Sequence, residues 1–184
     1  MDFRVLVLAF VPLLTGCSEL SSPSEQDSTY FNNPKFIEET AARLSFDKAA
    51  LQKQLSTAGK TEQNLVTVPD WPKEFALMAK TNLNAPALKG MFDLDSIPQK
   101  SGYKIVYTAL RDNMSIRKFI QCCDNSGKTL AVQCLQQEHS LITRQTIEWR
   151  LVADSGYYYR GSDQIKGVND LTYSIAGSFI PLKK

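Results

Sequence analysis

The sequence is poor in the residues on which hydrolytic and metal chemistry most often depend. It holds a single histidine, His139, and four cysteines, at positions 17, 122, 123 and 134. It contains no Gly-x-Ser-x-Gly turn and no glycine-rich phosphate loop at the start of a helix. One histidine and three cysteines on neighbouring strands do not match the ligand spacing of a zinc site. The sequence therefore predicts no catalytic residues, no metal and no cofactor.

Charge of one sign is not in excess either. The 21 Lys and Arg residues nearly balance the 19 Asp and Glu residues, which leaves a formal net charge of +2. A domain that binds nucleic acid is usually more basic, with its cations clustered on one face. We therefore expect no nucleic-acid partner. With 43% hydrophobic residues, the 184-residue chain is long enough for one domain with its own core.

Long hydrophobic runs are absent after the first twenty positions. No later segment approaches the roughly 20 apolar residues that cross a bilayer as a helix. The longest apolar stretch covers residues 5–14 and follows a single basic residue, Arg4. It is too short for a span, and Pro12 would disturb a lasting helix. Its length and position predict the hydrophobic region of a secretory signal peptide.

The four residues Leu14-Thr15-Gly16-Cys17 close this stretch, and they resemble the lipobox of bacterial lipoproteins. The resemblance covers residues 1–18 and implies that residues 1–16 are a cleaved signal peptide and that Cys17 is lipidated. Acyl chains on Cys17 would make the membrane a partner of a chain that does not span it. In this class the next residue sorts the product. Ser18 implies the outer membrane, with the protein facing the periplasm or exposed at the cell surface.

The residues that follow Cys17 predict a tether and then a domain. Residues 17–33 are rich in serine and poor in apolar side chains, which is typical of a flexible linker. The sixteen residues from Ser18 to Asn33 span roughly 20–24 Å as a random coil. Residues 34–184 are expected to form a single domain, and they resemble no particular domain family.

The first half of this domain shows helical periodicity. Asn33 and Pro34 predict a helix start, with Asn33 as the N-cap. A second helix is predicted from Ser45 to Gly59, separate from the first or continuous with it. A third begins near Asp70, and residues 84–101 are expected to be irregular or a short helix. The predicted buried stripe of the first helix is Phe36, Ile37, Ala41 and Leu44.

From Tyr103 onward the apolar residues alternate with a period of two, which predicts strands. The predicted strands cover residues 104–111, 115–123, 129–136, 141–153, 157–160 and 171–180. Helices followed by an antiparallel meander predict an α+β fold, in which N-terminal helices pack on a C-terminal antiparallel β-sheet of about five to six strands.

The sequence does not decide whether Cys122, Cys123 and Cys134 are free thiols or form a disulfide. Beyond the inner membrane a disulfide is allowed, so Cys134 could be bridged to Cys122 or Cys123. A tight turn near Ser126 would instead set Cys122 opposite Thr129 or Leu130, too far from Cys134 for a bridge. Buried free thiols are the main alternative, and a disulfide between Cys122 and Cys123 is a third.

The most suggestive binding feature is the run Tyr157, Tyr158, Tyr159 and Arg160. Strand alternation puts Tyr157 and Tyr159 on one face of a sheet and Tyr158 on the other. Tyrosine and arginine are frequent anchors of interfaces, so we expect a binding surface here. A core with an amphipathic edge is the alternative.

These features together predict a lipid-anchored, non-catalytic binding or interaction lipoprotein of the bacterial cell envelope. Its partner would be another envelope protein, peptidoglycan, or a toxin or hydrolase. One alternative is a small periplasm-facing enzyme with a dispersed active site around His139. Another is a lipid-handling carrier, which requires a cavity of several hundred Å3 between the helices and the sheet.

Overall fold

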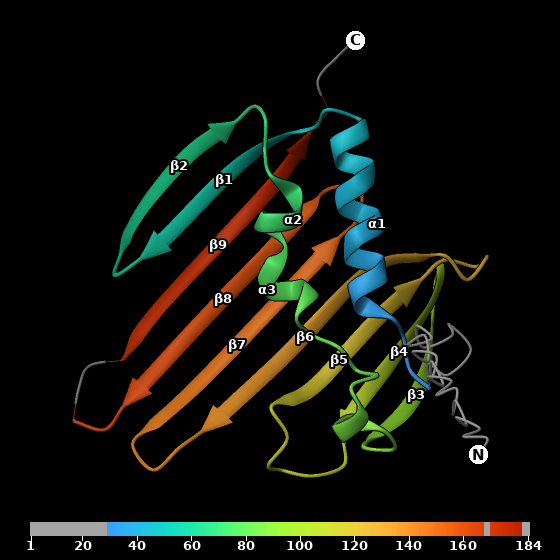
Figure 1. Ribbon diagram of the computed structural model, residues 1–184, viewed down its shortest axis with the longest axis vertical. Coiled ribbons are helices and arrows are strands. Elements are labelled where there is room, and N and C mark those ends of the chain that lie inside the picture. The colour runs from blue at the N-terminus through green and yellow to red at the C-terminus, as the bar shows by residue number, and fades with distance from the viewer. Residues whose placement is uncertain (1–28, 168–169, 182–184) are drawn as a thin grey trace, which may run out of the picture.

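The computed structural model describes residues 29–167 and 170–181, and these form one large antiparallel sheet with short helices on one face (Figure 1). The strand order is β2-β1-β9-β8-β7-β6-β5-β4-β3. The helices are α1 (Asn33–Phe46), α2 (Trp71–Glu74), α3 (Ala76–Ala79) and the 3-10 helix η2 (Pro86–Leu88). The strands are β1 (Ala50–Thr57), β2 (Lys60–Val66), β3 (Phe92–Gln99), β4 (Gly102–Ala109), β5 (Ile116–Cys123), β6 (Thr129–His139), β7 (Thr143–Val152), β8 (Gly156–Ile165) and β9 (Leu171–Ile180).

The predicted fold class is wrong. The α+β fold with N-terminal helices on a C-terminal sheet of about five to six strands is replaced by a sheet-dominated architecture with nine strands among the described residues. The strands predicted from residue 104 onward are present, but they make up only part of the sheet. Of the other three strands, β1 lies where the second helix was predicted and β3 largely where an irregular segment or short helix was predicted, and β2 lies in residues 60–66, for which no element was predicted.

The first strand of the β1–β2 hairpin replaces the predicted second helix. Leu51 and Leu55 are four residues apart, which suits a helix, but they also alternate with polar residues, which suits a strand. Ala58 and Gly59 decide between the two, because their φ angles of 47° and 78° form a two-residue turn. Positive φ at both central positions is the turn geometry that matches the twist of a hairpin. Gly59 therefore turns the chain between two strands and does not end a helix.

Pairing with the last strand brings this hairpin into the main sheet. β1 runs antiparallel to β9, with Leu51 opposite Phe179 and Thr57 opposite Tyr173. The opposite edge is β3, where Phe92 pairs with Ala109 of β4. Pro98 lies near the end of β3, as expected for an edge strand, whose outer side needs no amide donor. The sheet therefore has its N-terminal segments at both edges and the C-terminal meander between them.

The helices cover one face of the sheet, which we call the helix face, and we call the other the open face (Figure 1). Aromatic rings fill the space between the helices and the sheet. Phe75 packs edge-on against Tyr157, and Trp71 packs edge-on against Phe179. Further along the sheet Phe119 contacts the ring of Trp149. This aromatic layer fixes the position of α1, α2 and α3 over the sheet.

Candidate functional site

The structure separates the four residues of the predicted binding surface. Tyr157 and Tyr159 are buried on the helix face, whereas Tyr158 is 37% exposed on the open face together with Arg160. The alternation expected from the sequence is therefore present, but the four side chains do not share one surface. Each pair has to be considered with its own neighbours.

On the helix face, Tyr157 takes part in a polar contact between α2 and the sheet. Its hydroxyl donates to the Glu74 carboxylate, and the Lys53 Nζ lies 2.7 Å from Glu74 Oε1. Burial, reinforced by the Glu74 carboxylate, raises the pKa of Tyr157 above its ordinary value. The phenol therefore stays protonated and keeps donating at neutral pH. This contact fastens α2 to β1 and β8, which is a structural role.

Tyr159 packs in the same layer. Burial, with a contribution from the neighbouring Tyr173, raises the pKa of Tyr159 to about 12. The two rings are stacked, with centroids 6.2 Å apart. The ring of Tyr173 also covers Gly161, where an added Cβ would lie 2.2 Å from the ring. These tyrosines fill space above small residues of the sheet.

On the open face, Tyr158 and Arg160 lie in rows of polar side chains. Tyr158 is opposite Arg150 of β7, and Arg160 is opposite Glu148 of β7. The Glu148 carboxylate accepts a hydrogen bond from Gln133 Nε2 at 2.9 Å. Tyr158 and Arg160 also line a shallow, open hollow of about 390 Å3 beside the β1–β2 turn, which encloses a ligand less than a small-molecule site does.

Cys122, Cys123 and Cys134, the three cysteines within the described residues, are free thiols in the structure. Cys134 is opposite Phe119, whereas Cys122 is opposite Ala131 and Cys123 is opposite Thr129. Phe119 and Cys122 are three positions apart on β5, about 10 Å at strand spacing, which exceeds the reach of a disulfide. The predicted bridge of Cys134 to Cys122 or Cys123 is therefore not formed. Burial raises the pKa of the Cys134 thiol to about 12, so it is protonated and a poor nucleophile at neutral pH.

His139 lies at the exposed end of β6. Its Nδ1 accepts a hydrogen bond of 3.3 Å from Nε of Arg144, which is opposite it on β7. Among the described residues, the hydrogen-bond partner of the His139 side chain is thus the cationic Arg144. A catalytic base is usually oriented by a carboxylate. Among residues 29–167 and 170–181, no three His, Cys, Asp or Glu side chains come close enough together to hold a metal ion.

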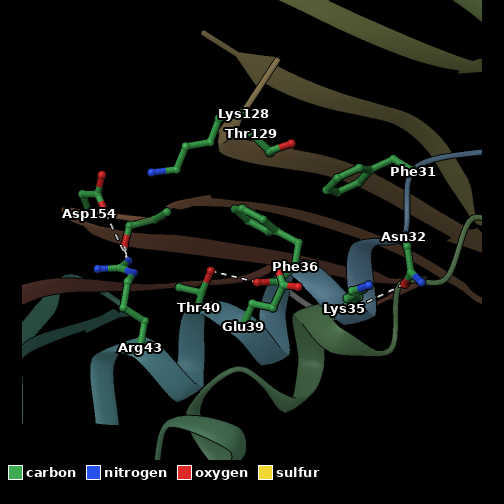
Figure 2. A pocket seen from close by; sticks show the side chains of 11 residues that line it. Phe31, Asn32, Lys35, Phe36, Glu39, Thr40, Arg43, Lys128, Thr129 and Asp154 are labelled. Carbon is green, nitrogen blue, oxygen red and sulfur yellow. Dashed lines mark hydrogen bonds and ion pairs between the residues drawn. The ribbon is translucent and has the colours of Figure 1, made fainter. Parts of the chain in front are cut away.

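A groove with a volume of about 430 Å3 runs along α1 and joins aromatic to charged side chains. We call it the α1 groove. One wall is α1 and the chain leading into it, and the other is formed by the β5–β6 and β7–β8 turns (Figure 2). The lining residues are Phe31, Asn32, Lys35, Phe36, Glu39, Thr40, Arg43, Lys128, Thr129, Ala153 and Asp154.

One end of the α1 groove is aromatic. The rings of Phe31 and Phe36 are 5.8 Å apart, and Phe31 also packs on the buried ring of Phe119, 5.9 Å away. Figure 2 shows the Phe36 ring reaching from α1 toward the β5–β6 turn. Both rings are only partly buried, so a ligand can contact them. Phe36 was predicted to belong to the buried stripe of the helix, and it lies at the edge of that stripe.

The other end of the α1 groove is charged. Arg43 Nη2 lies 3.2 Å from Asp154 Oδ1 and also donates to the carbonyl of Ala153. Lys128 extends its amine over the groove from the opposite side (Figure 2). A turn orders this lysine, since the backbone amides of Ser126 and Lys128 donate to Asp124 Oδ1 at 2.9 and 3.0 Å. The hydrogen bonds to the Asp124 carboxylate, led by that of the Ser126 hydroxyl, lower its pKa.

The α1 groove was not predicted from the sequence. The turn at residues 124–128 was expected, and so was the helix from residue 33, but nothing in the sequence shows that they face each other. The turn at Asp154 comes from a third segment. One local signal points to the charged wall of the groove. Glu39 and Arg43 are one turn apart on α1, beside its buried stripe.

Comparison with known proteins identifies no relative: no family model, no curated protein and no solved structure matches the chain. No helix within the described ranges has both the length and the apolar character that a bilayer span requires. The predicted signal peptide, residues 1–16, and the predicted lipidation site Cys17 lie outside the described residues.

Proposed function

We propose that this protein is a lipid-anchored, non-catalytic binding protein of the bacterial cell envelope, and that the α1 groove holds its ligand. The observation that carries the binding role is the groove itself, which joins two aromatic rings to cations and carboxylates within about 430 Å3. A ligand that matches it has an apolar group and charges of both signs. Peptide chemistry fits this description, whether the peptide belongs to an envelope protein, a toxin or hydrolase, or peptidoglycan.

The structure gives less support to the two alternatives. An enzyme built on His139 or Cys134 lacks a suitable group, because His139 is paired with Arg144 and the Cys134 thiol is buried and protonated. A lipid carrier needs a cavity between the helices and the sheet. Part of that layer is occupied by large rings such as Trp71, Phe75 and Phe119, each almost fully buried. The pocket of about 430 Å3 that remains between α2, α3 and the sheet is lined by the paired charges of Lys53 and Glu74 beside its apolar side chains, which suits a lipid chain poorly.

The anchor is tested by the intact mass of the mature protein isolated from envelopes. We expect the mass of a chain that begins at Cys17 and carries acyl groups, because the lipobox places cleavage before this residue. Replacing Cys17 with serine should release the protein from the membrane fraction, since the thiol is the site of lipid attachment. An unmodified mass that still includes Met1 would contradict the anchor.

The α1 groove is tested by reversing the charge of Lys128. Lys128→Glu should reduce capture of the partner, or of peptidoglycan, by about tenfold, because it places a like charge beside Asp154 and removes a cation from the groove. The measurement is quantitative recovery of crosslinked envelope proteins together with co-sedimentation with peptidoglycan.

The matched control is Lys100→Glu. Lys100 is also an exposed lysine in a strand-connecting turn at the same end of the sheet, but it does not line the groove. The Lys100→Glu variant has the same change in net charge as Lys128→Glu. Because position 100 lies outside the groove, this variant should bind like the unaltered protein. Equal binding by both variants would show that the groove is not the binding site, and recovery of no partner at all would count against the binding role.

A further inference from the structure

The turn between β6 and β7 presents two large aliphatic side chains to solvent. Leu141 is 100% exposed and Ile142 is 64% exposed. Ile165, the last residue of β8, pairs with Thr143 beside them and is exposed as well. We call Leu141, Ile142 and Ile165 the apolar tip. Turn positions are normally taken by glycine, asparagine, aspartate, proline or serine, so two consecutive aliphatic residues here are unusual.

Hydrogen bonds tie together the turn that carries the apolar tip. The Ser140 amide donates to the Thr143 carbonyl at 2.8 Å, and the hydroxyls of the two residues lie 2.6 Å apart. The Ser140 hydroxyl also accepts from the Thr143 amide at 3.0 Å. The Lys166 amide donates to the Ile142 carbonyl at 3.0 Å, which ties the end of β8 to the turn. The fold therefore holds these aliphatic groups outward, where water hydrates them unfavourably.

Exposure alone does not select this site, because Phe46 and Val68 are also exposed at the opposite end of the sheet. The position of the chain entry makes the difference. The Tyr30 hydroxyl accepts from the amide of Phe92, the residue opposite Ala109 at the last pair of β4. The loop after Ala109 leaves the sheet at the same end as the β6–β7 turn, since β4 and β6 run in the same direction. Figure 1 shows both connections at the lower end.

The reach of the preceding chain limits how far this end can lie from an anchor. Only residues 17–28 separate Cys17 from the first described residue, Thr29. At full extension of about 3.3–3.6 Å per residue, such a segment covers roughly 40 Å. A chain anchored at Cys17 therefore keeps Thr29 within that distance of the lipid, and Thr29 precedes Tyr30, which contacts the end of the sheet that carries the apolar tip.

The chemistry beside the apolar tip suits a phospholipid surface. Arg144 and Lys166 flank the turn, and long cationic side chains can reach lipid phosphates while their stems stay in apolar surroundings. Of the three neighbouring carboxylates, Asp163 accepts from Gln145 Nε2 at 2.7 Å and Asp170 accepts from Gln164 Nε2 at 3.0 Å, whereas Glu138 is exposed near the end of β6.

We propose that the apolar tip inserts into the surface of the membrane to which the chain is anchored, and so sets the orientation of the domain. This inference rests on the proposed lipid anchor. The β5–β6 and β7–β8 turns, which form one wall of the α1 groove, lie at the end of the sheet opposite the apolar tip. With the tip on the lipid, the charged end of the groove, at these turns, faces away from the bilayer.

The test places a tryptophan on the tip of the acylated protein. Leu141→Trp is purified from envelopes, checked for acylation by intact mass, and reconstituted into vesicles of phosphatidylethanolamine and phosphatidylglycerol with brominated acyl chains. The introduced indole should shift its emission to the blue and lose most of its intensity to the bromine. The native Trp71 and Trp149 are buried and give a constant background. Ile142→Trp serves as a second variant with the same expectation.

The control is Val68→Trp, because Val68 is 88% exposed in the loop after β2, at the other end of the sheet. Its indole should be neither shifted nor quenched. If the indole at position 141 is not quenched in an acylated protein, membrane insertion of the tip is wrong while the lipid anchor still stands. A blue shift without quenching would mean that protein, not lipid, covers the tip, and would also overturn the inference. Equal quenching at positions 141 and 68 would overturn it as well. A chain that proves unacylated overturns the anchor and this inference together.

Discussion

Replacing Phe119 with alanine should lower the free energy of unfolding by about 3–5 kcal/mol, the cost of removing a large ring from a filled core. Phe119 is 0% exposed in the middle of β5. Its ring lies 5.9 Å from those of Phe31 and Tyr107 and 6.1 Å from that of Trp149. It therefore connects the chain that enters α1 with two strands of the sheet, and these rigid rings cannot easily close the cavity.

The effect can be measured by urea unfolding, followed by the fluorescence of the buried tryptophans. Phe46→Ala is the matched control, because Phe46 is 87% exposed at the end of α1 and its loss should change the free energy of unfolding by less than about 0.5 kcal/mol. Similar losses for the two variants would mean that the aromatic layer does not stabilise the fold. Phe119→Ala should also weaken ligand capture, since Phe31 would lose the ring that supports it in the α1 groove.

The sequence predicted the central strands well because each of them is buried on at least one face. In β7, Trp149 and Leu151 alternate with Glu148 and Arg150, and this period survives in any register. The edge strand β3 gives no such signal. Apart from Phe92 its residues are all exposed, so nothing in its composition distinguishes strand from loop.

The β1–β2 hairpin was missed for a different reason. The spacing of Leu51 and Leu55 is compatible with both periods, and local sequence cannot choose between them. The choice is made by β9, which offers β1 a partner strand more than a hundred residues further along the chain. Tertiary pairing of this kind overrides local propensity. The α1 groove is beyond sequence reasoning for the same reason, because its walls come from three distant segments.

Asn33 shows how a correct local signal can hide a larger role. The pair Asn33-Pro34 predicted a helix start with Asn33 as its cap. The cap is instead Asn32, whose side chain accepts from the Lys35 amide at 3.2 Å, and Asn33 is the first residue of α1. The Asn33 side chain is fully buried, and its Nδ2 donates to the carbonyls of Met78 and Thr81 at 2.9 Å each. It thereby joins the start of α1 to the end of α3.

Replacing Asn33 with alanine should therefore cost about 2–4 kcal/mol, because it removes two buried hydrogen bonds and leaves the Thr81 carbonyl without its side-chain donor. Asn33→Asp keeps the size of the side chain but lacks the amide donors and buries a carboxylate, so it should be at least as destabilising. Both are measured against Asn32→Ala by urea unfolding. Asn32 is exposed and satisfies one amide, and losing such a cap costs about 1 kcal/mol.

The comparison of the two neighbouring asparagines separates helix capping from the joining of two helices. If Asn33 contributed only to the start of α1, its alanine variant would lose no more than that of Asn32. A larger loss for both Asn33 variants means that the helix layer is held together by this amide as well as by the aromatic rings beneath it. Because Asn33 does not line the α1 groove but lies between Asn32 and Lys35, which do, its variants should also reduce ligand capture by disturbing the start of α1.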